Sequence, residues 1–277
     1  MTNILVVLDG LNFSISQAGP IEYIARLAHG TLKIILLDVI PPPLPTLLPA
    51  VADSMYYSNE AADEHIAELQ QEVRQHAEEL KALLSAKGME YTFTTVTARP
   101  VETVVHESRF ADILLVPHTL SLSGIRDSEP PRAIRQILEK AECPVLTLPA
   151  TMQDIKETVL AYNGTHSSML AIRNFFRLFP ALGLRKVTVM YVNENGDDTV
   201  PDEELLRQYL AGICRKLTFQ TLHGSPSASL KVCLQFRRNI VITLGAYGRS
   251  RASRFFRESQ ADSLLELQHA YFFISHQ

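Results

Sequence analysis

The feature of this sequence that most constrains its fold is a repeated series of short apolar segments. Each half of the 277-residue chain contains five of them, in the same order and at similar spacing. They span 3–9, 31–40, 91–97, 111–117 and 143–149 in the first half, and 158–164, 185–193, 217–224, 239–245 and 270–276 in the second. Their apolar residues are continuous rather than alternating, which is typical of parallel strands buried on both faces. The repeat therefore predicts two copies of one unit.

Helical patterns lie between these predicted strands. The clearest covers 61–86, and its apolar stripe consists of Ile66, Leu69, Val73, Leu80 and Leu84. Its shorter counterpart, roughly 202–216, carries Leu206, Leu210, Ile213 and Cys214. Strands that alternate with helices predict βαβ units and a mainly parallel sheet. We therefore expect an α/β fold, with two tandem doubly wound five-stranded parallel-sheet domains.

A polar stretch at 150–157 separates the two sets of strands, so we expect one domain over 1–150 and the other over 157–277. A proline-rich insertion, 41–60, follows the second strand. Its prolines exclude a central strand or a helix start within 41–49. The insertion is either a loop packed on its own domain or a cover over a ligand cleft, since long loops in compact domains are often functional.

Composition narrows the class of protein. Hydrophobic residues make up 46% and charged residues 20%, as in globular domains. Apolar runs stay short of the ~18 residues of a membrane span, and the N-terminus lacks the pattern of a signal peptide. The three scattered cysteines are typical of reduced thiols. These features predict a cytoplasmic protein that does not bind membranes.

Charge is unevenly distributed along the chain. The net charge of −4 argues against a nucleic-acid partner recognised by bulk electrostatics. Residues 1–152 carry 11 Lys and Arg against 19 Asp and Glu, whereas residues 153–277 carry 15 against 11. This asymmetry predicts that the two halves have different functions.

Candidate ligand-binding residues follow the first and fourth strands of each unit. In a doubly wound sheet, ligands bind at the carboxyl ends of the strands, where the strand order reverses. In the second half these positions hold Asn163-Gly164-Thr165 and Gly245-Ala246-Tyr247-Gly248. Glycines there allow backbone amides to approach a phosphate group.

With these segments in this order, the whole chain resembles a tandem universal stress protein, in which two such domains are fused. The resemblance rests in the first half on ILVVLDG, ADILLVP and ILEKAECPVLTLP, and in the second on VLAYNGTHSS, HGSP, LGAYGRSR and the closing FFISH. It implies a stress-response protein whose two domains form a pseudo-twofold pair. It also implies association with a second chain or a protein partner.

Nucleotide-binding members of that family carry the motif G-x2-G-x9-G-[S/T] after the fourth strand. Gly245 and Gly248 match its first two glycines, and Ser259 matches its last position, but Glu258 replaces the third glycine. The resemblance therefore implies ATP or a related nucleotide as a weakly bound ligand of the second domain. Arginines occupy the stretch between, at Arg249, Arg251, Arg254 and Arg257. They either hold the anion or form a solvated basic helix face.

Some of the other positions of the family's nucleotide site match this sequence, and one does not. Asn163 replaces the acidic residue that Asp9 retains in the first half. Val192 matches a position whose backbone contacts the base, and Gly224 begins the family's glycine-x-proline turn.

The first half departs further from the family's motif. Its glycine positions hold Pro117, Leu120 and Pro130. Proline removes an amide donor and leucine adds a side chain where the phosphate would approach. We therefore expect the first half to bind no nucleotide, or to bind a ligand differently.

Enzyme signatures are missing from the sequence. It contains no P-loop, no G-x-S-x-G and no H-E-x-x-H motif, so we assign no catalytic or metal-binding residue. Four histidines near strand ends are either ligand contacts or loop and interface residues, namely His118, His166, His223 and His276. Three functions remain: a nucleotide-binding stress-response protein, an interaction or dimerisation module of the same fold, and a slow ATPase.

Overall fold

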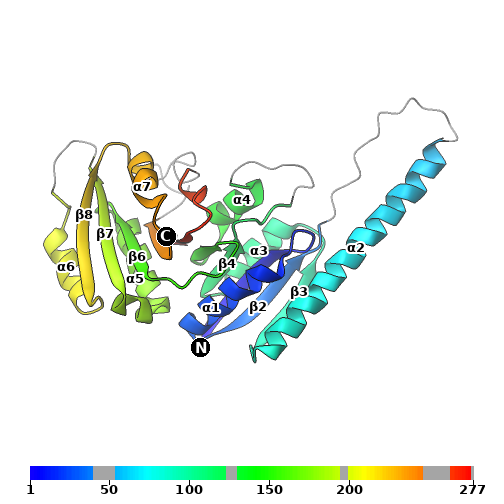
Figure 1. Cartoon of the computed structure of the whole chain (residues 1–277), viewed down its shortest axis with the longest axis horizontal. Coiled ribbons are helices and arrows are strands. Elements are labelled where there is room, and N and C mark those ends of the chain that lie inside the picture. The colour runs from blue at the N-terminus through cyan, green and yellow to red at the C-terminus, as the bar shows by residue number, and fades with distance from the viewer. Residues whose placement is uncertain (40–53, 123–129, 194–198, 246–262, 276–277) are drawn as a thin grey trace.

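Ten strands form one continuous sheet in the computed structural model, which describes residues 1–39, 54–122, 130–193, 199–245 and 263–275 (Figure 1). The strands are β1 (Thr2–Asp9), β2 (Gly30–Leu37), β3 (Tyr91–Val96), β4 (Ile113–Pro117), β5 (Val145–Leu148), β6 (Glu157–Tyr162), β7 (Lys186–Asn193), β8 (Lys216–His223), β9 (Ile240–Gly245) and β10 (Tyr271–Ser275). Each lies within or beside one of the predicted segments. The predicted α/β class with a mainly parallel sheet is confirmed.

The strand order is β3-β2-β1-β4-β5-β10-β9-β6-β7-β8. Each half therefore contributes its own five strands in the same doubly wound order. The halves meet where β5 and β10 pair antiparallel, with Leu146 opposite Phe273. We call this junction the β5–β10 seam. Periodicity alone did not predict that the two units share one sheet, and the boundaries at 150 and 157 stay a prediction.

Helices cover both faces of the sheet. They are α1 (Ala18–Ala28), α2 (Ser54–Ala86), α3 (Pro100–Ser108), α4 (Arg132–Lys140), α5 (His166–Leu178), α6 (Glu203–Ala211) and α7 (Pro226–Leu234), with the short 3-10 turns η1 (Ile15–Gln17) and η2 (Pro180–Leu184). Alternate residues of β1 enter opposite cores: Val6 belongs to the core on the face covered by α1, α2, α5 and α6, whereas Val7 belongs to the core on the face covered by α3, α4 and α7. Burial on both faces explains the continuous apolar runs.

Two helices differ from their predicted limits. Helix α2 already begins at Ser54, and Figure 1 shows its first part running beyond the sheet. Val73, Leu80 and Leu84 of the predicted stripe are buried, but Ile66 and Leu69 are only half-buried because the sheet does not reach them. Helix α6 ends at Ala211 rather than 216. Among the described helices, none is both long enough and apolar enough to cross a bilayer.

Candidate functional site

The strand order of the second half reverses between β6 and β9. These two strands pair directly, with Leu160 opposite Thr243, and their carboxyl ends lie at the same edge of the sheet. The next strands along, β7 and β8, end at that edge too. Helix α5 starts just after β6, so its first turn lies at this edge. Such a position is where doubly wound sheets bind ligands, and a helix N-terminus there favours anions.

Gly245 ends β9 against the first turn of α5. A Cβ atom at this position would lie 2.5 Å from the carbonyl carbon of Ser167 and 2.6 Å from the backbone nitrogen of Ser168. Real Cβ contacts are never so short, so glycine is required by packing alone. Gly245 therefore brings two backbone segments together at the edge where the sequence predicts a nucleotide.

Asn163 organises the turn between β6 and α5. Its side-chain oxygen accepts hydrogen bonds from the backbone nitrogen of Thr165 at 3.1 Å and from the Thr165 hydroxyl at 2.6 Å. The Thr165 hydroxyl in turn caps α5 by accepting from the backbone nitrogen of Ser168. Gly164 lies between them at a φ of +74°, which favours glycine. The Asn163 side chain thus has a structural role within the protein.

Val192 and Gly224 lie at the ends of β7 and β8. Val192 is 3% exposed, its side chain belongs to the core, and it pairs with Leu222 of β8. Gly224 has a φ of +105°, and its amide donates to the carbonyl of Asn193 at 3.2 Å. The structure therefore brings Asn163, Gly164, Val192, Gly224 and Gly245 to one edge of the sheet. Gly248, Arg249 and Ser259, with Glu258 and the remaining arginines, lie outside the described residues.

Asp9 has the same position in the first half as Asn163 in the second. Its carboxylate accepts hydrogen bonds from the backbone nitrogens of Leu11 at 3.0 Å and Asn12 at 3.2 Å, and from the Asn12 side chain at 2.8 Å. Burial raises the pKa of Asp9 despite these bonds. The carboxylate therefore stabilises its own turn.

The segment after β4 uses its amides within the protein. The His118 amide donates to the carbonyl of Leu148 at 2.9 Å, and the Leu120 amide donates to the carbonyl of Pro117 at 3.0 Å. Pro117 has no amide hydrogen, and Leu120 is buried. These two amides are therefore already paired within the protein, and the absence of nucleotide binding by the first half stays a prediction.

His118 links the two halves of the chain. Its Nε2 donates to the carbonyl of Ala270, just before β10, at 2.9 Å, and lies 3.3 Å from the Thr147 hydroxyl of β5. The ring packs edge-on against Phe272. Burial lowers the pKa of His118 to about 4. Of the two roles open to this histidine, the structure supports the interface role.

Sequence reasoning missed one polar contact at the equivalent edge of the first half. The buried Gln17 side chain donates to the Thr119 hydroxyl at 2.8 Å, which joins η1 to the loop after β4. No motif surrounds Gln17, so no sequence signal marked it. Within the described ranges, no cluster of three His, Cys, Asp or Glu side chains could hold a metal ion.

This fold and edge geometry define a class, the doubly wound α/β proteins in which two five-stranded units share a sheet. No family model and no curated protein matches the chain. Solved structures do match it. A universal stress protein from Archaeoglobus fulgidus DSM 4304 is 15% identical with a TM-score of 0.57, over 100% of this chain and 96% of that one.

Two proteins from Pseudomonas aeruginosa match at similar levels. A putative universal stress protein from strain UCBPP-PA14 is 13% identical with a TM-score of 0.57, over 99% of this chain and 93% of that one. A protein of unknown function from strain PAO1 is 13% identical with a TM-score of 0.54, over 99% and 92%. At such low identity the likeness concerns the fold, and the chain has the fold of these universal stress proteins.

Proposed function

We propose that this protein is a cytosolic stress-response protein whose second half binds ATP or a related nucleotide weakly. The observation that carries the proposal is the contact of Gly245 with the first turn of α5 at the point where the strand order reverses. Gly248 follows Gly245 by three positions in the sequence, so backbone amides of this segment and the N-terminus of α5 would bind the same phosphate.

The geometry argues for a difference between the halves. The first half fills the equivalent positions with Pro117 and the buried Leu120, and the amides there bond to backbone carbonyls. One nucleotide per chain, held in the second half, is the expected stoichiometry. Glu258 would place a carboxylate near the phosphate and weaken the affinity, because two like charges ~4 Å apart repel by about 4 kcal/mol at an effective dielectric near 20.

An alternative function is an interaction or dimerisation module of the same fold that binds no nucleotide. The structural role of the Asn163 side chain favours it, since the oxygen that would meet a ribose or base already accepts two hydrogen bonds. In that case the protein acts through a second chain or a protein partner. A slow ATPase is the least supported function, because no residue is assigned as a general base.

Calorimetry with ATP on the purified full-length protein tests the proposal. We expect weak binding at one site per chain, loss of binding in Gly248→Val, and about tenfold tighter binding in Glu258→Gly, which corresponds to ~1.4 kcal/mol. Gly212→Val is the matched control because nothing lies within 4 Å of a Cβ atom there. No binding by wild type or Glu258→Gly at millimolar ATP would favour the interaction module.

A further inference from the structure

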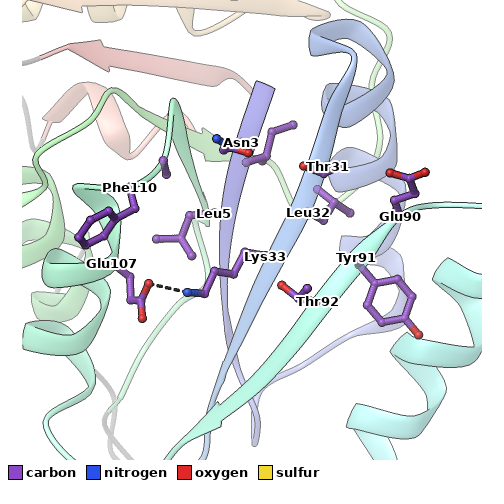
Figure 2. A pocket seen from close by; sticks show the side chains of 12 residues that line it. Asn3, Leu5, Thr31, Leu32, Lys33, Glu90, Tyr91, Thr92, Glu107 and Phe110 are labelled. Carbon is purple, nitrogen blue, oxygen red and sulfur yellow. Dashed lines mark hydrogen bonds and ion pairs between the residues drawn. The ribbon is translucent and has the colours of Figure 1, made fainter. Parts of the chain in front are cut away.

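A cavity of about 550 Å³ opens at the edge of the sheet opposite the candidate nucleotide site (Figure 2). It lies over the amino ends of β1, β2 and β3, next to the end of α3. Its lining residues include Asn3, Leu5, Lys33, Thr92, Glu107 and Phe110. Its volume is in the range of ~300–1,000 Å³ that is usual for small-ligand sites.

The cavity combines an apolar wall with one ion pair. Phe110 is 70% exposed, although a large aromatic side chain is normally buried, and Leu5 is fully buried beneath the cavity. Lys33 Nζ lies 2.6 Å from Glu107 Oε2 across the cavity. Figure 2 shows Phe110 and Glu107 along one side, with Lys33 reaching toward Glu107 from β2.

The second half supplies an internal comparison for this cavity. Helices α3 and α7 are both nine residues long and begin at Pro100 and Pro226. In this alignment Phe110 corresponds to Phe236, which is also exposed, and Ala111 corresponds to Arg237. Glu107 corresponds to Cys233. The turns after β1 and β6 align Asn3 with Glu157.

Arg237 fills the equivalent space in the second half. Its Nη1 donates to Glu157 Oε1 at 2.9 Å, and its Nη2 donates to Gln220 Oε1 at 3.0 Å and contacts the Cys233 sulfur at 3.6 Å. Lys186 Nζ also lies 3.1 Å from Glu157 Oε1. The carboxylate of the second half therefore binds two cations, a lysine and a guanidinium.

The first half also has a carboxylate and a lysine beside this space, but at other positions: Thr31 lies opposite Asn3, where Lys186 lies opposite Glu157 in the second half. Ala111 replaces Arg237, so no side chain enters the space from that position. The carboxylate is on the helix, at Glu107, rather than on the strand, where Asn3 supplies an amide oxygen. Glu107 retains a lysine partner in Lys33. Compared with the second half, this space lacks a guanidinium group and the planar set of hydrogen-bond donors that it supplies.

We propose that this cavity binds an alkylguanidinium group, which takes the place that Arg237 occupies in the second half. Its nitrogens donate to the Glu107 carboxylate and the Asn3 side-chain oxygen. The exposed ring of Phe110 provides a surface on which a guanidinium stacks. The excess of acidic residues over 1–152 favours a cationic ligand further.

Two sources can supply this group, a small guanidinium compound or an arginine side chain of another polypeptide. The probes that separate them are n-butylguanidinium and the peptide acetyl-Gly-Arg-Gly-amide. Each probe is titrated to about 10 mM into the isotopically labelled full-length protein, and binding is followed by NMR. A titration to this concentration detects millimolar affinity. We expect amide shifts at Lys33, Thr92, Glu107 and Phe110. Shifts with n-butylguanidinium alone, or tighter binding of it than of the peptide, indicate a small compound, whereas tighter binding of the peptide indicates a polypeptide.

Matched ligands and variants test the chemistry. n-Butylammonium and the peptide acetyl-Gly-Lys-Gly-amide carry the same charge as the two probes but lack the planar set of guanidinium donors. They should bind at least about fivefold more weakly. Glu107→Gln should weaken binding about tenfold, since hydrogen bonds to a charged acceptor are the stronger kind. Ala111→Arg should abolish binding by filling the cavity with its own side chain.

A gain of binding provides the strictest control. Arg237→Ala should open a second site, with new shifts at Gln220 and Cys233, while ATP affinity stays unchanged. The proposal is wrong if neither probe shifts the cavity residues, if Glu107→Gln binds as wild type does, or if the ammonium ligands bind equally well.

Discussion

Asp9 ends the first strand of the first half and Asn163 comes directly after the first strand of the second, and both accept hydrogen bonds from the turn that comes next. Both oxygens of the aspartate accept hydrogen bonds, whereas the asparagine accepts two with its single oxygen. Asp9 and Asn163 thus stabilise the turns that follow them, and the family's motif marks these same two positions as ligand contacts. At the residue scale, a motif match alone does not separate the two roles.

The pKa of His118 predicts how the stability of the folded protein depends on pH. This pKa is about 4 in the folded protein, because burial disfavours the charged ring, and ~6.5 in the unfolded chain. As the pH falls below about 6.5, the unfolded chain binds a proton that the folded protein does not. Folding should therefore lose stability between about pH 6.5 and 4, by up to about 3 kcal/mol.

Urea denaturation at intervals from pH 8 to 4 measures this loss. His118→Gln removes the titrating ring and should flatten the profile, whatever its effect on stability at pH 8. His166→Gln is the control, because His166 is exposed at the start of α5. A slope that survives unchanged in His118→Gln would show that other groups cause it.

At the scale of elements, the close packing of the end of β9 against the start of α5 requires a residue without a side chain at position 245. Gly245 leaves no space for a Cβ atom beside Ser167 and Ser168. Since both segments are backbone, neither can rotate away as a side chain would. The contact fixes the separation between the two elements that border the candidate site.

Gly245→Ala should consequently lower the free energy of unfolding by about 1–3 kcal/mol, as overpacking does elsewhere. Gly212→Ala is the matched control, because a Cβ atom there meets nothing within 4 Å, and its effect should stay within about 0.5 kcal/mol. Chemical denaturation of the three proteins at one pH measures the difference. Equal stability of wild type and Gly245→Ala would mean that α5 shifts without penalty.

Sequence patterns predicted the elements better than their junctions. Continuous apolar runs such as 3–9 and 239–245 identify strands directly, because burial on both faces leaves a local signature. The apolar stripe predicts only 61–86 of α2, since the first part of this helix has no sheet to pack against and so lacks a clear stripe. Gly245 was recognised, but its contact with α5 depends on residues about 80 positions apart, which no local pattern records.

For the whole molecule, the decisive contact is the β5–β10 seam. Phe272, Phe273 and Ile274 pair with Thr147, Leu146 and Val145, and all six are buried. His118 adds a hydrogen bond across the same junction. The doubly wound arrangement of each half followed from the sequence, but this antiparallel pairing did not, because two similar units can be joined along more than one edge.

Separated halves should therefore not behave as stable monomers. Residues 1–152 and 153–277, expressed alone, each expose an apolar strand with unpaired backbone groups, which promotes association. Light scattering coupled to size-exclusion chromatography measures their mass. Coexpression should restore a one-to-one complex of the two halves. Two monodisperse monomers with cooperative melts would contradict this expectation.

The shared sheet also bears on how the two halves came to differ. In an assembly of two identical subunits, every substitution appears twice, at positions related by symmetry. Here each position is encoded once, so Arg237 can close a space in one half while Ala111 leaves its counterpart open in the other. When two similar units are fused in one polypeptide, a single substitution changes one unit and leaves the other as it was. The two units can therefore acquire binding sites with different specificities.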